Sequence, residues 1–331
     1  MEAWILDRYG KRNQLRLAEV ATPAMRETDV LVQVRAASIN PLDAKIRGGE
    51  FRPILPYRLP LILGNDLARV VEVGSRASRF KPGDEVYARP DKDRIGTFAE
   101  LIAIDESDLA LKPARLSMEE AASIPLVGLT AWQALVETAG LMRGQKVLIH
   151  AGAGGVGTIA IQLARHFGAE VATTTSTVNV EWVKALGADH VIDYKQQDFS
   201  TVLRGYDVVL TSLDKGTLEK SLRVLKPGGK LISISGPPDP AFARSISASW
   251  PLRLVMRLLS HRIRKQAQAR QVSYSFLFMR AEGGQLREIT RLIDAGIIRP
   301  VLDRVFPFDA INAALAYVEQ GRAKGKVVVR T

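Results

Sequence analysis

The chain has 331 residues, enough for two ordinary domains, and a formal net charge of +11 that comes mostly from one segment, residues 244–280. Its hydrophobic fraction of 47% and charged fraction of 24% are near globular averages, and no apolar run reaches the roughly 18 residues of a membrane span. The chain has no cysteine, which excludes disulfides, thiolate catalysis and cysteine-ligated metals; with an N-terminus unlike a signal peptide, it predicts a cytoplasmic location.

The first hundred residues have the pattern of short strands. Residues 29–39 and 67–75 are rich in β-branched side chains, and residues 96–104 alternate between apolar and polar positions. Glycine and proline punctuate these runs, as they do in residues 81–88. This part of the chain is therefore predicted to be an all-β module with short connections.

The pattern changes at Ser117, which has Glu120 three residues later and so predicts a capped helix start. From Gln145 onward, strand-like and helix-like segments alternate, which is typical of βαβ units with a parallel sheet. The predicted strands cover residues 146–151, 170–176, 190–194, 206–213 and 229–236, and the predicted helices cover residues 158–168, 180–187 and 218–229. A further helix over 285–296 and a last strand over 324–330 follow.

The strongest motif is HAGAGGVG, residues 150–157, which lies between a predicted strand and a predicted helix. Its pattern Gly152-x-Gly154-x-x-Gly157 is typical of a dinucleotide-binding loop in this context. The first glycine permits the tight turn, the second lets backbone approach the pyrophosphate, and the third lets the helix pack on the sheet. The other residues expected to touch the cofactor here are Ala153, Gly155 and Val156. The alternative is a chance glycine-rich turn.

The second strand of the unit favours NADPH over NADH. An NAD site usually has an acidic residue at the end of this strand. Here the strand ends in Thr175 and Ser176, and no acid follows until Glu181. Hydroxyl groups can donate to a 2′-phosphate that a carboxylate would repel, and Lys195 can add positive charge. The alternative is that these residues are ordinary polar positions at a strand end.

Several motifs together resemble the zinc-free quinone oxidoreductase and enone reductase branch of the medium-chain dehydrogenase/reductase superfamily. They are INPLD at 39–43, LGND at 63–66, LTAW at 129–132, AGAGGVG at 151–157, LGADHVIDY at 186–194, LKPGGKLI at 225–232 and GRAKGKVVV at 321–329. The resemblance implies an α/β fold with a Rossmann doubly wound parallel sheet and a GroES-like β-rich catalytic domain. It assigns residues 1–124 and 271–331 to the catalytic domain and 125–270 to the NADP-binding domain, and it implies a homodimer.

The resemblance also implies roles for individual residues. Asn40 takes the place of a cysteine zinc ligand of zinc-dependent relatives, near the nicotinamide and the substrate oxygen. Gly64-Asn65-Asp66 stands where those relatives carry Gly-His-Glu, so no metal site is expected. The resemblance places further residues at the cofactor: Thr130 and Gly236 beside the nicotinamide, Ser176, Asn179, Tyr194 and Lys195 around the 2′-phosphate, and Lys326 in the tail that closes over it.

The predicted reaction is hydride transfer from NADPH to a quinone or an α,β-unsaturated carbonyl. Asn40 or Lys45 would stabilise the negative charge that develops on the carbonyl oxygen, and Lys45 or solvent would supply the proton. Lys45 is equally compatible with a solvated surface lysine. A reductase of enoyl thioesters and a non-catalytic NADPH-binding protein, associated with nucleic acid or a membrane surface, are the alternatives.

Residues 244–280 carry eight Arg and Lys residues and no Asp or Glu. Leu252, Val255, Met256 and Leu259 have helical spacing and predict one apolar face, with the arginines largely elsewhere. The pattern favours a helix over the substrate cleft or at a subunit contact, with its arginines in water. Contact with an anionic membrane and, less favoured still, binding of nucleic acid are the other interpretations of a basic amphipathic helix.

Overall fold

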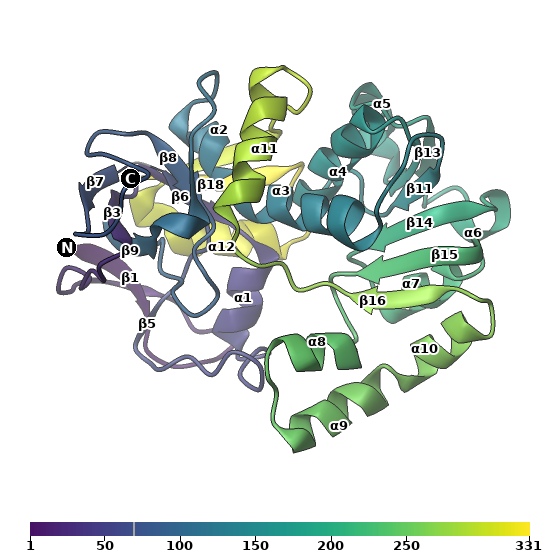
Figure 1. The fold of residues 1–331 in the computed structure, drawn as a ribbon, viewed down its shortest axis with the longest axis horizontal. Helices are drawn as coiled ribbons and strands as arrows, with labels where there is room; N and C mark the ends of the chain where they lie inside the picture. Colours follow the sequence, from purple (N-terminus) through teal and green to yellow (C-terminus); the bar gives the residue numbers. More distant parts are fainter. Residues whose placement is uncertain (69) are drawn as a thin grey trace. The chain divides into compact units, whose positions relative to one another are not determined.

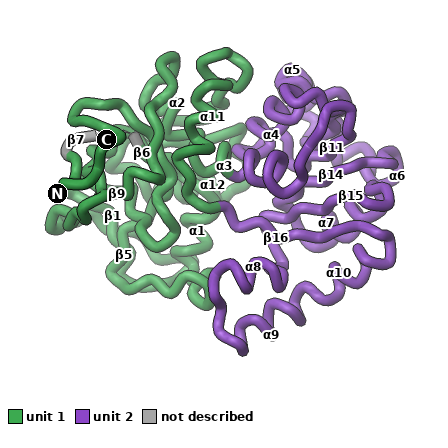
Figure 2. Tube along the Cα trace, viewed as in Figure 1, with its two compact units in different colours: residues 1–129, 280–331 green, residues 130–279 purple. Residues whose placement is uncertain are grey.

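The computed structural model describes residues 1–68 and 70–331, which separate into two compact units (Figures 1 and 2). Unit 1 contains residues 1–129 and 280–331, and unit 2 contains residues 130–279. Arg69, inside the predicted strand over 67–75, lies outside the described residues.

The unit boundaries differ from the predicted ones after residues 124 and 270. They follow Leu129 and Met279 instead. The first turn of α3 (Pro125–Trp132) belongs to unit 1, where the Leu126 amide donates to Asp66. The second boundary moves because β16 (Ser273–Phe276) pairs with β15 (Leu225–Ser233) as the sixth strand of the unit 2 sheet.

Unit 1 is built on short strands. They are β1 (Glu2–Leu6), β2 (Arg16–Glu19), β3 (Asp29–Gln33), β4 (Ala36–Ile39), β5 (Leu61–Ile62), β6 (Leu67–Ala68), β7 (Val70–Val73), β8 (Val86–Ala88), β9 (Leu101–Asp105), β10 (Leu109–Leu111), β17 (Leu302–Pro307) and β18 (Lys326–Arg330). Among the described residues they form sheets in the orders β2-β1-β5, β10-β8-β6, β7-β3-β9 and β17-β18-β4. The helices of this unit are α1 (Pro41–Gly48), α2 (Met118–Ala122), α11 (Gly283–Asp294) and α12 (Ile311–Glu319).

The end of the chain completes the β-rich unit that its beginning starts. Strand β18 pairs antiparallel with β4, with Val327 opposite Ile39, and parallel with β17. The shared core includes Val30, Val32, Leu63, Phe98, Leu315 and Val329. Burial of this apolar surface holds the distant segments together, so both ends of the chain lie in unit 1.

Unit 2 contains a parallel sheet in the order β13-β12-β11-β14-β15-β16, as predicted for a doubly wound fold. The strands that precede β15 are β11 (Lys146–Ile149), β12 (Glu170–Thr175), β13 (His190–Asp193) and β14 (Tyr206–Thr211). The helices are α4 (Gly155–His166), α5 (Val180–Ala185), α6 (Phe199–Val202), α7 (Lys215–Ser221), α8 (Pro240–Ser245), α9 (Trp250–Leu259) and α10 (His261–Gln268). Residues such as Leu148, Ala172, Val209 and Leu231 form its core.

Local signals in the sequence predict some boundaries and miss others. Ser117 caps α2 as predicted, because its Oγ accepts from the Glu120 amide at 3.2 Å and the Glu120 carboxylate accepts in return from the Ser117 amide at 2.9 Å. The predicted helix over 218–229 is wrong in its second half. Helix α7 ends at Ser221, and Leu225 starts β15 by pairing with Tyr206, because sheet pairing outweighs local helix propensity. The predicted strand over 29–39 is two strands, β3 and β4.

The basic segment of unit 2 is helical, as predicted, but its apolar face differs from the prediction. Met256 is buried, whereas Val255 and Leu259 are exposed. Only the inward row of α9 therefore packs on the protein. Within the part of the chain that the structure describes, no helix has the length and apolarity needed to cross a bilayer.

Candidate functional site

The glycine-rich loop of unit 2 connects β11 to α4, and its three motif glycines differ in how closely they are packed. A Cβ on Gly152 would lie 2.2 Å from Thr173 Oγ1, and one on Gly157 would lie 2.3 Å from the Ala151 carbonyl oxygen. Both positions are therefore closed to larger residues by close packing. A Cβ on Gly154, in contrast, would meet only the Ala151 oxygen, at 3.3 Å.

Gly154 is the N-cap of α4, so the start of this helix has no capping side chain and no acidic residue in its first turn. The free N–H groups and the partial positive charge of the helix start suit an anion. Gly152 and Gly157 are closely packed, and a Cβ on Gly154 would meet a single atom. The residues present thus fit the pyrophosphate of a dinucleotide.

The ends of β12 and β13 lie side by side and bring together the residues predicted to hold the 2′-phosphate. The Tyr194 amide donates to the Thr175 carbonyl at 3.1 Å. Ser176 and Asn179 are linked by a 3.0 Å hydrogen bond from Asn179 Nδ2 to Ser176 Oγ. The side chains of Tyr194 and Lys195 are exposed, whereas Thr175 is buried.

An acidic residue outside the predicted set, Asp193, lies next to this cluster. Asp193 ends β13 opposite Thr175, and its Oδ1 accepts from the Lys195 amide at 3.0 Å. A hydrogen bond from Thr177 holds the pKa of Asp193 below its usual value. Asp193 is buried, and its hydrogen bond with the Lys195 amide holds the turn that carries Lys195.

His150, at the start of the loop, is a structural residue. Its Nδ1 lies 3.0 Å from Thr174 Oγ1 and its Nε2 lies 3.0 Å from Ser221 Oγ. Burial lowers the pKa of His150 to about 3, so the ring is neutral at physiological pH. The ring therefore links β12 to α7 beneath the loop.

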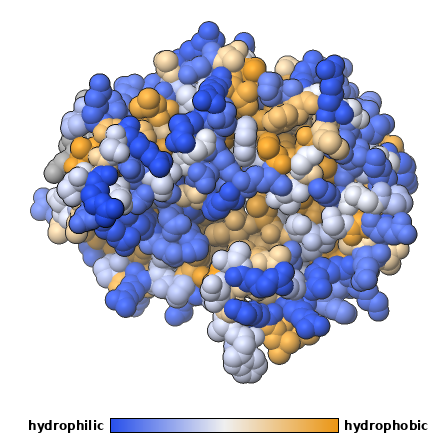
Figure 3. Space-filling model, viewed as in Figure 1, coloured by the Kyte–Doolittle hydropathy of each residue, from blue (hydrophilic) through white to orange (hydrophobic). Residues whose placement is uncertain are grey.

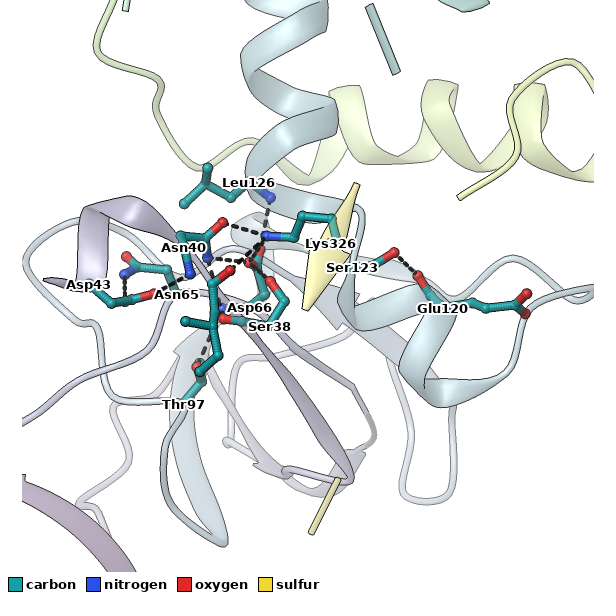
Figure 4. A network of polar contacts seen from close by, with 11 residues as sticks. Ser38, Asn40, Asp43, Asn65, Asp66, Thr97, Glu120, Ser123, Leu126 and Lys326 are labelled. Atoms are coloured by element: carbon teal, nitrogen blue, oxygen red, sulfur yellow. Dashed lines mark hydrogen bonds and ion pairs between the residues drawn. The ribbon is translucent and has the colours of Figure 1, made fainter. Parts of the chain in front are cut away.

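A second polar cluster lies in unit 1, where Asn40, the N-cap of α1, meets residues from three other segments (Figure 4). Two carboxylates are at its centre. Asp43 accepts from the backbone N–H of Asn40 at 2.7 Å and from Asn65 Nδ2 at 2.7 Å. Asp66 accepts from the Ser38 hydroxyl, from Asn40 Nδ2 at 2.9 Å and from the Leu126 amide at 2.8 Å.

The side chain of Asn40 is fully engaged within this cluster. Its Nδ2 donates to Asp66 and to the Ser38 carbonyl, and its Oδ1 accepts from Lys326 Nζ. Asn40 is only 1% exposed. To donate to a substrate oxygen, the amide would have to give up one of these bonds. The geometry therefore favours a positioning role for Asn40 over direct donation.

Lys326 is the buried cation of the cluster. Its Nζ lies 3.9 Å from Asp66 Oδ2, donates to Asn40 and lies 3.4 Å from the Ile39 carbonyl oxygen. Burial lowers the pKa of Lys326, and the carboxylates of Asp66 and Asp43 oppose that effect. Burial also raises the pKa of Asp43 to about 6. The ammonium group thus offsets part of the negative charge that the two aspartates bring inside.

Lys45 does not join this cluster. It lies on α1 with an exposed side chain, and it makes no ion pair with the residues that the structure describes. Thr130 is buried in α3, and Gly236 follows β15 with a φ of 103° that favours glycine. Asn40 and Lys326 belong to unit 1, whereas Thr130, Gly236 and the glycine loop belong to unit 2.

Part of the cluster depends on contacts between distant segments, which local sequence patterns do not indicate. Asp66 and Asp43 were visible in the motifs LGND and INPLD, but nothing local indicates that both meet Asn40. The local signal for this close packing is the glycine of LGND, Gly64. Its φ is 106°, and a Cβ there would lie 2.3 Å from Thr97 Oγ1. Such a glycine marks a backbone held closely against its neighbour.

Across residues 1–68 and 70–331, no group of three or more His, Cys, Asp and Glu side chains is arranged to hold a metal ion. The positions that zinc-dependent relatives use for ligands carry Asn40, Asn65 and Asp66, and Asn is a poor zinc ligand.

Comparison with known proteins identifies the family. The family described as alcohol dehydrogenase GroES-like domain matches residues 26–114, and that described as zinc-binding dehydrogenase matches residues 186–329. A 2-methylene-furan-3-one reductase from Solanum lycopersicum is 37% identical over 341 residues, which cover 99% of this chain and 79% of the relative.

The chain belongs to the quinone oxidoreductase and enone reductase branch of the medium-chain dehydrogenase/reductase superfamily. An NADPH-dependent alkenal/one oxidoreductase from Arabidopsis thaliana is 36% identical, over 99% of this chain and 79% of that protein. The solved quinone oxidoreductase from Coxiella burnetii is 31% identical, with a TM-score of 0.87 over 100% of this chain and 99% of that one. As a member of this branch, the protein is an oxidoreductase that uses a nicotinamide cofactor.

Proposed function

We propose that this protein is an NADPH-dependent reductase that transfers a hydride to a quinone or an α,β-unsaturated carbonyl without zinc. The observation that carries the proposal is the loop between β11 and α4. It is closely packed at Gly152 and Gly157, and the absence of a side chain at Gly154 leaves backbone that a pyrophosphate can approach. The acceptor class is supported by the relatives named as a furanone reductase, an alkenal/one oxidoreductase and a quinone oxidoreductase.

The preference for NADPH rests on the ends of β12 and β13. The hydroxyl of Ser176, the exposed phenol of Tyr194 and the exposed ammonium of Lys195 lie on adjacent strand ends. The carboxylate of Asp193, which ends β13, is buried and accepts from the Lys195 amide. A 2′-phosphate would thus meet donors and a positive charge rather than an exposed acid.

The reduced nicotinamide supplies the hydride when it is bound, and the protein orients it and stabilises charge. Asn40 holds the polar cluster in place through Asp66 and Lys326. Lys45, with its exposed side chain, remains the candidate for donating to the developing oxyanion. The buried ammonium group of Lys326 donates to Asn40 Oδ1 and lies 3.4 Å from the Ile39 carbonyl oxygen, so it helps to hold Asn40 in place.

The experiment that tests this function is oxidation of NADPH and NADH by the purified protein against quinones, short enals, cyclic enones and enoyl thioesters. Turnover that favours NADPH is expected, and the best acceptor defines the substrate class. Binding of NADPH without reduction of any acceptor would instead support a non-catalytic NADPH-binding protein. Dependence on added zinc would contradict the zinc-free mechanism.

The homodimer and the cytoplasmic location stay predictions from the sequence. Light scattering of the purified protein tests the first, and fractionation of cells that express the chain tests the second.

A further inference from the structure

Helices α9 and α10 belong to a segment whose charge is one-sided. Residues 240–281 contain eight Arg and Lys residues and no Asp or Glu. Arg262 has a partner in Glu219, with 3.2 Å between Nε and Oε1. Arg257 and Lys265 are exposed and have no ion-pair partner among the described residues. The positive charge of this surface is therefore only partly neutralised by the protein.

The same segment exposes large apolar side chains. Five of the thirteen that are exposed among the described residues lie on the ten-residue helix α9: Trp250, Leu254, Val255, Leu258 and Leu259. Trp250 is 78% exposed and Leu258 is 65% exposed. Figure 3 shows apolar surface beside strongly hydrophilic side chains over this helix. Leaving so much apolar area in water is unfavourable, so a cover for it would be stabilising.

The helix arranges these side chains in rows, because residues four apart lie on one face. Met256 and Ser260 form the inward row and are buried. The opposite side carries Leu254 with Leu258 and, next to them, Val255 with Leu259. An arginine row, Arg253 with Arg257, borders the leucines. An exposed apolar face with cations along its edge is the pattern of a helix that lies in a membrane interface.

We propose that α9, with the first turns of α10, docks on the surface of an anionic lipid bilayer. The apolar rows would enter the boundary between headgroups and acyl chains, and Arg257 and Lys265 would lie at the level of the lipid phosphates. The charge complementarity between a segment without any acid and an anionic surface selects this partner. This inference is independent of the hydride-transfer function, because it concerns no residue of the glycine loop or the polar cluster.

Two other partners fit the surface less well. Nucleic acid would use the arginines, but it would leave the exposed leucines in water, since phosphate contacts are polar. A second copy docked through its own α9 would bring two arginine rows together, and residues 240–281 supply no acid to pair with them. Both remain distinguishable outcomes of the experiment below.

The test is co-sedimentation of the full chain with vesicles of phosphatidylcholine alone or with about one-third phosphatidylglycerol. Binding only to the anionic vesicles is expected, and it should weaken as salt is added. Replacing Arg257 and Lys265 by Gln should weaken binding about thirtyfold. Replacing Leu254 and Leu258 by Ser should weaken it about tenfold or more.

Matched controls lie on other faces of the same unit. Lys184→Gln with Arg223→Gln removes two exposed charges, and Met142→Ser with Val202→Ser removes two exposed apolar side chains. Both controls should bind vesicles like the parent protein. The emission of Trp250 should shift to shorter wavelength on anionic vesicles, and Trp250→Phe should abolish that shift. Circular dichroism confirms that each variant is folded.

Three results would overturn the proposal. One is equal binding to neutral and anionic vesicles, or none to either. Another comes from measuring binding to duplex DNA. If the parent and the leucine variant bind DNA and the Arg257 and Lys265 variant does not, the surface belongs to nucleic acid. The last is a fall in molar mass by light scattering in the leucine variant, which would assign the surface to a second copy.

Discussion

The glycine loop of unit 2 and the polar cluster of unit 1 achieve their geometry in different ways. The loop is eight consecutive residues, and its shape depends on backbone and on absent side chains, at Gly152, Gly154 and Gly157. The cluster depends on side chains from segments as far apart as Asn40 and Lys326. The first N–H groups of α4 at the end of the loop have no partner within the helix and can donate to a ligand, whereas the cluster satisfies most of its own polar groups.

The two regions are therefore damaged by different kinds of substitution. A loop made of backbone is damaged by any added atom that cannot fit. A buried cluster of charges is damaged by removal of one partner, because the remaining charge stays in a medium of low dielectric constant. Stability and cofactor affinity should therefore respond differently to changes in the two regions.

The largest effect is expected for Lys326→Met in the cluster. Removing the ammonium leaves Asp66 buried without its cation, and the free energy of unfolding should fall by about 3–5 kcal/mol. Urea unfolding without cofactor measures this change. A second substitution, Asp66→Asn, should restore part of the loss. A fall of less than about 1 kcal/mol would contradict this role of Lys326 in the fold.

The glycine loop offers a pair of substitutions with opposite expectations. In Gly157→Ala the new Cβ meets the Ala151 carbonyl oxygen at 2.3 Å, so stability should fall by about 1–3 kcal/mol and NADPH binding should weaken. In Gly154→Ala the nearest atom is 3.3 Å away, so stability should hold while NADPH affinity falls. Thermal unfolding and NADPH titration separate the two. Equal destabilisation by both would contradict the assigned roles.

The cluster should make stability depend on pH through Asp43. Burial raises its pKa to about 6, above the value of about 3.9 in an unfolded chain. The folded chain therefore keeps a proton that the unfolded chain releases. The contribution of Asp43 to stability is thus full below about pH 4 and falls by about 2 kcal/mol as pH rises to about 6.

Asp43→Asn tests this pH dependence. The variant should lose that part of the slope, measured as the difference from the parent in urea unfolding at about pH 4 and pH 7. The change is tolerable because Asn65 Oδ1 is buried without a hydrogen-bond partner among the described residues, and a rotated Asn65 amide could accept from the new side chain. A parallel slope in both proteins would contradict the raised pKa.

The smallest expected effect concerns cofactor choice in unit 2. Ser176→Asp places a carboxylate where the 2′-phosphate is proposed to bind. The ratio of kcat/KM for NADPH to that for NADH should fall about tenfold or more, equivalent to about 1.4 kcal/mol. Thr201→Asp on α6 adds the same charge at an exposed position and should leave the ratio unchanged. An unchanged ratio in the Ser176 variant would remove the argument for NADPH.

Much of the fold was predictable because it depends on local patterns. The alternation of strands and helices predicted the parallel sheet, and Ser117 with Glu120 predicted the start of α2. The prediction failed where pairing between strands decided the outcome. Leu225 entered β15 rather than a helix, and β16 moved the domain boundary to Met279 because it found a neighbour in β15.

The sequence by itself determined the glycine loop, the family and the absence of cysteine ligands, since each depends on residue identity at close spacing. Only the tertiary structure decided that the side-chain amide of Asn40 donates to Asp66 and Ser38, that Lys326 is the cation of the cluster, and that Leu258 faces solvent. Charge balance and burial are sums over neighbours in space. A sequence shows which groups are present, but the fold decides which of them meet.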